Sequence, residues 1–194
     1  IVRQLATAEG AKASGKTDLA LAAAKGLYKL MAYKDEYEVA RLYSAPEFKA
    51  ALSAQFSKHD RLEFHLSPPI FARKDKLTGE PYKYSFGAWM LPVFGFLAKR
   101  KTLRGGRFDI FGYSAERKLE RKMIGDYEAL LAEIGSKLTA QNHRVAVDLA
   151  ALAMEIKGFG YIKHRNYEIA KQKEAALLAK FRDPNPAPVL RAAE

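Results

Sequence analysis

A short glycine-containing segment, residues 10–17, has the residue types and spacing that could hold a nucleotide. It reads Gly-Ala-Lys-Ala-Ser-Gly-Lys-Thr. This matches the phosphate-binding loop in which backbone N–H groups cradle phosphates, the lysine reaches the β- and γ-phosphates, and the hydroxyl binds magnesium. That geometry requires a buried strand before the first glycine, whereas residues 4–9 are not strand-like. The second carboxylate for magnesium is also missing, because Asp148 lies within a helical apolar pattern. We therefore interpret the match as a loop between two helices and keep a nucleotide-binding enzyme as an alternative.

The most cationic segment, residues 99–122, could bind anions through its arginines. It contains nine basic and three acidic side chains around a Gly-Gly turn, with interspersed aromatic residues. Arginines beside a glycine turn and a helix N-terminus can hold phosphate or carboxylate groups. The structural interpretation, which we favour, is a loop pinned by its aromatic residues, with arginines closing onto Asp109 and Glu120. The candidate anion- or partner-binding residues here and in a second basic group, residues 157–165, are Arg104, Arg107, Arg117, Arg121, Lys157, Lys163 and Arg165.

Side chains that hold metals or act as nucleophiles are few. The chain has no cysteine, which excludes disulfides, thiolate catalysis and cysteine-ligated iron–sulfur clusters. Its histidines are His59, His65, His143 and His164, and no two of them have a metal-ligand spacing on one helix. We therefore expect no metal-binding residue and no catalytic residue in this chain.

The charge balance points to an anionic partner. The 194 residues include 33 lysines and arginines against 22 aspartates and glutamates, a net charge of +11. A surplus of this size favours contact with nucleic acid, an anionic cofactor, an acidic protein or a membrane surface. The most apolar run, residues 86–98, is shorter than a membrane span and contains Pro92. Without a signal-peptide pattern or cysteine we expect a cytoplasmic location with no membrane contact. Because the sequence does not begin with Met, we expect an excised piece or a processed product.

Helices are expected to position these residues in the first third of the chain. A first helix ends before a small-residue loop at residues 9–15. The apolar spacing within residues 17–43 then predicts one long helix. Ser44, with Pro46 and Glu47, reads as a capping box that opens a further short helix.

The middle of the chain has the pattern of β-structure. Residues 61–66 alternate apolar and polar side chains, as a half-buried strand does. Residues 70–73 and 82–86 are two further short strands that flank a turn-rich segment at residues 75–81. We expect a small antiparallel β-hairpin element within about residues 61–86, inserted between helices.

The second half of the chain returns to helical patterns. Ser114 is expected to cap a long helix, and Thr139 is expected to open another that ends at Gly158. A last helix covers about residues 163–181.

These patterns together predict a mainly α fold. One helical domain covers residues 1–181 and contains the β-hairpin element. The Pro-rich residues 182–194 are expected to form a disordered tail. No internal repeat and no domain boundary before the tail is visible in the sequence.

Five segments taken together are more specific than any one of these patterns. They resemble, in this order, the C-terminal region of the long, fused indolepyruvate ferredoxin oxidoreductases of bacteria. The resemblance covers almost the whole chain. The segments are YKLMAYKDEYEVARLY at residues 28–43, FHLSPPIFAR at 64–73, TGEPYKYSFGAWM at 78–90, LRGGRFDIFGYSAERKLER at 103–121 and IKGFGYIKHRN at 156–166.

The resemblance implies a larger enzyme that oxidatively decarboxylates indolepyruvate or another aryl 2-oxoacid. Such an enzyme uses thiamine diphosphate and coenzyme A and passes electrons through iron–sulfur clusters to ferredoxin. Its thiamine site has a Gly-Asp-Gly signature, whereas this chain has Gly125, Asp126 and Tyr127 inside a helical pattern. The clusters need cysteines, which this chain lacks. None of the family's catalytic residues can therefore be carried over, and we expect the cofactors elsewhere in the parent enzyme.

The resulting expectation is an accessory domain that is not an enzyme alone and packs on the catalytic domains of its parent. Its basic loops would attract acidic ferredoxin or the phosphates of coenzyme A. A basic module that binds nucleic acid through the same loops is a further alternative, which no recognition motif supports. The residues expected at the interface with the catalytic domains are Trp89, Met90, Val93, Phe94 and Phe96.

Overall fold

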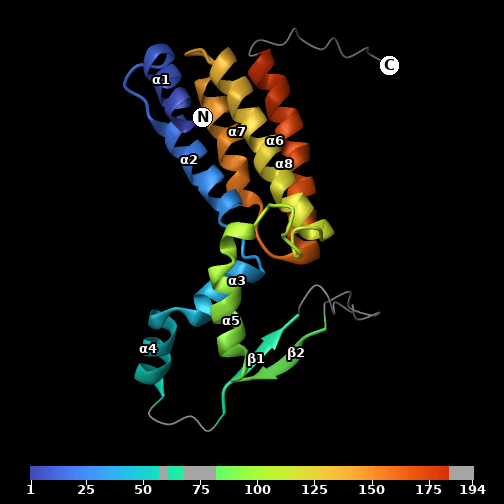
Figure 1. The fold of residues 1–194 in the computed structure, drawn as a ribbon. Coiled ribbons are helices and arrows are strands. Elements are labelled where there is room, and N and C mark those ends of the chain that lie inside the picture. Colours follow the sequence, from blue (N-terminus) through green and yellow to red (C-terminus); the bar gives the residue numbers. More distant parts are fainter. Residues whose placement is uncertain (57–60, 68–81, 184–194) are drawn as a thin grey trace, which may run out of the picture. The chain divides into compact units, whose positions relative to one another are not determined.

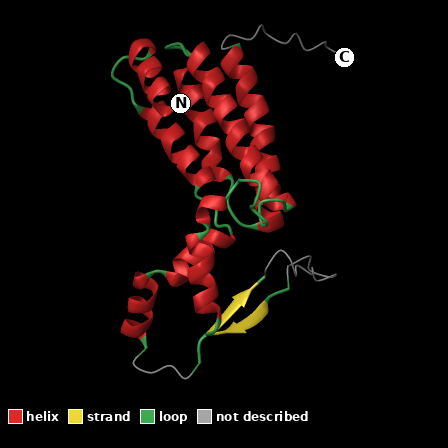
Figure 2. Cartoon of the chain, in the orientation of Figure 1, coloured by secondary structure: helices red, strands yellow, loops and turns green. Residues whose placement is uncertain are grey.

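The computed structural model describes residues 1–56, 61–67 and 82–183 (Figures 1 and 2). Contacts within the chain group these residues into two compact units. Unit 1 contains Ile1–Tyr33 and the chain from Leu119 onward, and unit 2 is the continuous segment Lys34–Lys118. Among the described residues, no helix has both the length and the apolar character that a membrane crossing requires. The elements in chain order are α1 (Val2–Lys12), α2 (Asp18–Met31), α3 (Glu36–Ser44), α4 (Pro46–Gln55), β1 (Glu63–Leu66), β2 (Tyr84–Gly87), α5 (Met90–Lys99), η2 (Lys101–Leu103), α6 (Ala115–Lys137), α7 (His143–Ala151), η3 (Leu152–Glu155) and α8 (Gly160–Arg182).

The predicted fold class, mainly α with a small antiparallel β element, is confirmed. Strands β1 and β2 pair antiparallel, with Phe64 opposite Phe86, so the strands expected at residues 61–66 and 82–86 are both present. The strand expected at residues 70–73 and the turn at 75–81 lie outside the described residues, as does most of the expected tail.

Unit 1 is a bundle of long helices around one apolar core. Helices α1, α2, α7 and α8 lie side by side with most of α6 (Figure 1). The predicted apolar stripe of α6 faces this core, where Tyr127, Leu131 and Ile134 are buried. The Tyr127 hydroxyl donates a hydrogen bond of 2.7 Å to the backbone oxygen of Ala150, which ties α6 to α7. Burying such stripes against one another supplies most of the stability of helices of this length.

Unit 2 has a separate, aromatic core. Phe94 of α5 and Phe64 of β1 are both 3% exposed, and their rings meet edge to face at 5.1 Å. Tyr43 of α3 packs against both rings, at 5.0 Å from Phe64 and 5.2 Å from Phe94. Edge-to-face pairs, such as Phe64 with Phe94 and Tyr43 with Phe64, and the stacked pair of Tyr43 with Phe94 stabilise the fold beyond simple area burial. The β-hairpin is thereby held on the α3–α5 pair.

The single helix predicted for residues 17–43 is wrong. The chain leaves the helical conformation after Met31, and a new helix, α3, begins at Glu36. Asp35 is the N-cap of α3, because its Oδ1 accepts a hydrogen bond of 2.8 Å from the N–H of Glu38. A side chain that caps backbone donors favours a helix start over a helix interior. The apolar spacing continues across the break and therefore conceals it.

Other helix starts also differ from the predictions. Ser44 is the last residue of α3 and does not cap α4, so the capping box is wrong, although Pro46 does occupy the first turn as predicted. Helix α1 runs on to Lys12, so the loop expected from residue 9 begins four residues later. Thr139 does not open α7.

The helix α7 begins only after a turn. Thr139 and Asn142 exchange hydrogen bonds of 2.8 and 3.2 Å between backbone N–H groups and side-chain oxygens. Because this turn satisfies its own polar groups, the helix begins at His143. The last helix begins at Gly160, three residues before the predicted start. The predicted cap of α6 is confirmed: the Ser114 hydroxyl accepts a 3.3 Å hydrogen bond from the N–H of Arg117.

Candidate functional site

The arginines of the basic loop in unit 2 are paired with acidic side chains at the start of α3. Arg104 forms an ion pair with Asp35, and the Arg117 Nε lies 3.5 Å from Glu36 Oε2. Lys101 donates a 2.7 Å hydrogen bond to Glu38. The Arg117 side chain is only 11% exposed, so its charge is directed into the unit. These cations hold the loop against α3.

The same loop is fixed from within by Asp109. Its two carboxylate oxygens accept hydrogen bonds from the N–H groups of Gly105, at 2.7 Å, and Gly112, at 2.9 Å. Gly105 has a φ of +75°, a conformation that side chains with a Cβ rarely adopt. Phe111 meets Tyr37 edge to face at 5.4 Å. Pinning of the loop by aromatic residues was predicted, with the arginines closing onto Asp109 and Glu120. Arg104 and Arg117 form ion pairs with Asp35 and Glu36, at the start of α3.

Electrostatics in this cluster follow from pairing and burial. Hydrogen bonds from Arg41 and Lys101 lower the pKa of Glu38 to about 2. Burial raises the pKa of Glu36, against the opposing charge of Arg117. Burial also raises the pKa of Tyr37, with a further contribution from Asp109. A dense set of mutually compensated charges such as this one stabilises a loop conformation more readily than it captures a solute anion.

The side chains that this loop exposes are mostly apolar. Phe108 is 78% exposed, Ile110 is 65% exposed and Tyr113 is 59% exposed. The Tyr113 hydroxyl donates a 2.9 Å hydrogen bond to the backbone oxygen of Arg107, whose own side chain is exposed. The loop therefore presents aromatic and aliphatic surface to its surroundings. Among the anion-binding residues predicted in unit 2, Arg107 is exposed beside this apolar surface.

The remaining predicted cations lie in unit 1. Lys163 donates a 2.8 Å hydrogen bond to Glu120, which is buried. Lys157 and Arg165 are exposed, and Arg121 is half-buried on α6. Lys157 and Lys163 lie near enough to Lys29 for their charges to lower its pKa, and Arg165 follows on α8. The structure thus separates the predicted set into two groups, one in each unit.

The expected interface residues of α5 divide between two environments. Phe94 lies in the core of unit 2 and is therefore not available to a partner, whereas Met90 packs partly against that core and is half-buried. Trp89 and Phe96 are 62% and 58% exposed, and Val93 is 37% exposed. The Arg100 guanidinium lies 5.0 Å from the centre of the Phe96 ring. The helical period explains the division, since positions 90 and 94 share one face.

Beside the nucleotide-like segment at residues 10–17, a carboxylate of the chain itself lies at the start of α2. The first three residues of the segment lie in α1. The carboxylate of Glu9 accepts hydrogen bonds from the N–H groups of Leu19, at 2.8 Å, and Ala20, at 2.9 Å, in the first turn of α2. His143 Nε2 lies 2.7 Å from the same carboxylate. Glu9 is only 1% exposed, so the donors that a phosphate would use are occupied.

The pKa of Glu9 reflects these contacts. Burial alone would raise it, but the hydrogen bonds from His143, Ala20 and Leu19 lower it below the ordinary value of 4.5. The carboxylate is therefore charged at neutral pH, as a helix N-terminus favours. The segment serves as a helix-to-helix connection.

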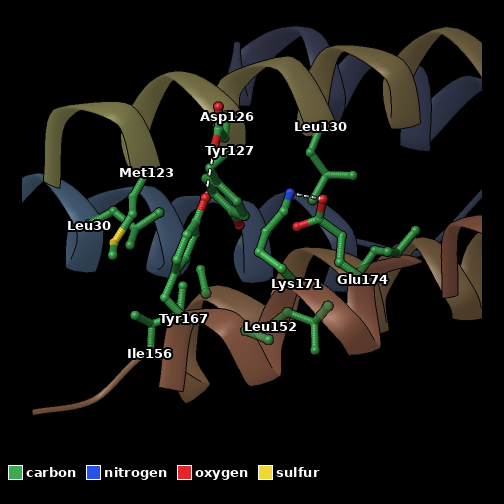
Figure 3. Close-up of a pocket in the computed structure, with 13 residues that line it drawn as sticks. Leu30, Met123, Asp126, Tyr127, Leu130, Leu152, Ile156, Tyr167, Lys171 and Glu174 are labelled. Carbon is green, nitrogen blue, oxygen red and sulfur yellow. Dashed lines mark hydrogen bonds and ion pairs between the residues drawn. The ribbon is translucent and has the colours of Figure 1, made fainter. Parts of the chain in front are cut away.

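Unit 1 has a small, partly open depression between its helices (Figure 3). The space in it that a water molecule can enter is about 20 Å³, roughly enough for a single water. The polar side chains of the depression are paired: Tyr167 donates a 2.9 Å hydrogen bond to Asp126, and Lys171 forms an ion pair with Glu174. Apolar residues that are themselves in the core line the rest, namely Leu30, Met123, Leu130, Leu149, Leu152, Ala153, Ile156 and Ala170. We assign no ligand to this depression.

Two features were missed in the sequence. Lys29 was read only as part of a helix, yet its Nζ donates hydrogen bonds of 3.0 and 2.8 Å to the backbone oxygens of Ala153 and Met154. Phe159 and Tyr161 were noted only as members of a mixed basic segment, yet they are 69% and 58% exposed. The alternation of basic and aromatic residues was the available signal. Within the described residues, no group of His, Asp and Glu side chains has an arrangement that could hold a metal ion.

One family model matches the chain, over residues 1–176, and its description is a family of unknown function, DUF6537. The match covers most of the chain, so the protein belongs to the DUF6537 family. No curated protein and no solved structure matches it.

Proposed function

We propose that this member of the DUF6537 family is an accessory domain of a cytoplasmic aryl 2-oxoacid ferredoxin oxidoreductase, and that it packs on the catalytic domains of that enzyme. The five segments that resemble the C-terminal region of indolepyruvate ferredoxin oxidoreductases support the parent enzyme. Thiamine diphosphate, iron–sulfur clusters and coenzyme A would be held by the catalytic domains. The chain itself would contribute contact surface.

The observation that carries this proposal is the exposure of apolar side chains on the loop at residues 103–114, whose charged side chains are partly paired within unit 2. Its arginine Arg104 is paired within unit 2, while Phe108 and Ile110 are 78% and 65% exposed. Loops of soluble proteins usually expose charges and bury aromatic residues. A loop that reverses this order, and that Asp109 holds rigid, fits a surface that another protein covers.

Exposed residues of α5 extend the apolar surface of unit 2. Trp89, Val93 and Phe96 remain from the interface that the sequence predicted. Aromatic side chains dominate the energy of protein interfaces because they bury large areas at a small cost in conformational entropy. The proposed contact with the catalytic domains therefore consists of these three residues with Phe108 and Ile110.

The alternatives receive less support. A nucleotide site at residues 10–17 would have to displace the buried carboxylate of Glu9. Nucleic-acid binding through the loop of unit 2 would use arginines that are paired with Asp35 and Glu36. Attraction of acidic ferredoxin or of coenzyme A phosphates remains part of the proposal, through the cations of unit 1.

The test uses the chain together with the separately expressed catalytic part of the parent enzyme. We expect a one-to-one complex in analytical ultracentrifugation. The double variant Phe108→Ser with Ile110→Ser is expected to weaken the complex by at least about tenfold, because each serine removes about 1–2 kcal/mol of apolar contact. Calorimetry measures the affinity.

Leu21→Ser is the matched control, since Leu21 is 52% exposed on α2 of unit 1. It should leave the affinity unchanged. Absence of a complex at micromolar concentrations, or equal weakening by both variants, would contradict the proposal. Circular dichroism establishes that each variant is folded.

A further inference from the structure

We propose that one end of unit 1 is a docking surface for an acidic protein segment with apolar side chains. This surface, which we call the α8 entry, consists of the segment from Met154 to Arg165 together with Lys29. This surface would hold the acidic partner of the proposed function. It rests on that function only for the identity of the acidic protein that binds. A fixed segment of chain presents both positive charges and apolar side chains, which complement the carboxylates and apolar side chains of such a partner.

The segment is fixed by hydrogen bonds from two sides. Lys29 Nζ holds the backbone oxygens of Ala153 and Met154. Three residues after Met154, the backbone oxygen of Lys157 accepts a 2.8 Å hydrogen bond from the side-chain amide of Asn166. The segment from 154 to 160 is therefore folded back on the beginning of α8. A surface fixed in this way loses little conformational entropy when a partner binds.

A tight glycine turn within the segment adds to this rigidity. Gly158 has a φ of +96°. A Cβ at this position would come within 2.7 Å of Ile162 Cγ2. The turn therefore requires glycine both for its backbone conformation and for its close contact with α8.

Cations gather at the α8 entry. Within the described residues, neither Lys157 nor Arg165 has an ion-pair partner, and both are exposed. Lys163 has Glu120 beside it. Burial and the positive charges of Lys157 and Lys163 lower the pKa of Lys29, so these three lysines repel one another. Glu120 already pairs with Lys163, so a partner's carboxylate beside Lys157 would relieve the remaining repulsion.

Large apolar side chains accompany these cations. Phe159 and Tyr161 are 69% and 58% exposed, and Met154 and Ile162 are each about 40% exposed. Aromatic residues inside a polar rim are typical of the centre of a protein interface. The expected partner therefore carries carboxylates around one or two apolar side chains.

Carboxylates in and beside the α8 entry favour a protein partner over a nucleic acid. Glu155 forms an ion pair with Lys173 at 2.6 Å, and Glu168, which is exposed, lies on α8 just beyond the α8 entry. A phosphate backbone is repelled by such groups, whereas a protein partner can place neutral or basic residues against them. A single-stranded oligonucleotide is therefore the competing probe.

The test measures fluorescence anisotropy of a labelled synthetic peptide of aspartates and glutamates with two central phenylalanines, titrated with the full chain. We expect binding that weakens at least about tenfold between about 20 mM and 300 mM salt, as screening of exposed charges requires. The variant Lys157→Glu with Arg165→Glu should weaken binding about tenfold, and Phe159→Ser about fivefold.

Lys16→Glu is the matched control. Lys16 is an exposed cation before the first turn of α2, and Lys29 lies near the far end of that helix. The control should change the affinity less than twofold. The proposal is overturned by a peptide affinity that is undetectable at low salt, by equal weakening in control and test variants, or by tighter binding of a poly-dT oligonucleotide than of the peptide.

The two proposals can fail separately. Phe108→Ser with Ile110→Ser lies in unit 2 and should leave the acidic peptide bound. If this variant binds the peptide normally while the wild-type chain forms no complex with the catalytic part, the docking surface stands and the parent enzyme is misassigned. The reverse result retains the parent enzyme and removes the docking surface.

Discussion

The carboxylate of Glu9 takes the hydrogen-bond positions that an anionic ligand would use at the start of α2. Its donors are Leu19 and Ala20 of the following helix and His143 of a distant one. The sequence indicated that the phosphate-loop match was accidental, because no strand precedes it. It could not show what replaces the phosphate, since Glu9 lies outside the pattern and His143 is 134 residues away.

Replacement of Glu9 is therefore expected to destabilise unit 1. Glu9→Gln removes the negative charge and leaves a buried amide against three donors, so the free energy of unfolding should fall by about 2 kcal/mol or more. Urea denaturation followed by circular dichroism measures this change. Glu128→Gln, an exposed position of α6, should change it by less than about 0.5 kcal/mol.

The same residue gives a pH dependence of known sign. The pKa of Glu9 is lower in the folded chain than its ordinary value of 4.5. The contribution of the charged carboxylate to the free energy of unfolding is therefore complete above pH 4.5. The contribution is lost as the pH falls through the folded-state pKa. The stability difference between wild type and Glu9→Gln should thus shrink below about pH 4.5. A difference that stays constant down to the lowest pH at which the chain is folded would contradict this account.

At the scale of elements, a helix could be predicted from the sequence where all of its apolar residues pack into the same core. The stripe of α6 and its Ser114 cap were both read from the sequence, because each is a local pattern. The break between α2 and α3 was not, since the stripe belongs to unit 1 before the break and to unit 2 after it. The pairing of the basic loop with Asp35 and Glu36 joins residues 69 and 81 positions apart, and no local pattern in the sequence could have predicted it.

Close packing between α2 and α6 gives an element-scale prediction. A Cβ at Gly26 would overlap the hydroxyl of Tyr127 and lie 2.8 Å from its Cζ. That hydroxyl is hydrogen-bonded to Ala150 and cannot yield freely. Gly26→Ala should therefore destabilise the protein by about 1–3 kcal/mol, although alanine is the better helix former.

Gly125→Ala is the matched comparison on α6. A Cβ there has no neighbour within 4 Å, so the substitution should stabilise the protein by about 0.5–1 kcal/mol. Thermal unfolding of both variants tests the pair. Stabilisation by both variants would show that helix propensity rather than the contact with Tyr127 decides the outcome, and destabilisation by both would contradict the prediction for Gly125.

At the scale of the whole molecule, the two cores share no residue. Leu131 belongs to the core of unit 1 and Phe94 to the core of unit 2. The sequence predicted the helical class and the small β element correctly. It did not indicate two units, because unit 1 is assembled from segments on either side of unit 2 and no linker composition marks the junctions.

Separate cores predict separate responses to mutation. Phe94→Ala should lower hydrogen-exchange protection in unit 2 by about 3 kcal/mol, with little change in α6 to α8. Leu131→Ala should lower it in unit 1 by a similar amount and leave β1, β2 and α5 protected. Exchange followed by mass spectrometry resolves these peptides. Equal loss in both units after either substitution would mean that they unfold as one.

The placement of unit 2 between α2 and α6 also has a consequence for synthesis on the ribosome. Helices α1 and α2 emerge early, but their core partners Leu131, Ile134 and Leu149 emerge about a hundred residues later. During that interval, some seconds at usual elongation speeds, Leu19 and Leu30 lack the part of their core that α6 and α7 supply. Unit 2 is continuous and can complete its core first. The nascent chain therefore passes through a stage in which α1 and α2 are less completely folded than unit 2, which follows them in the sequence, and a holding chaperone has its target there.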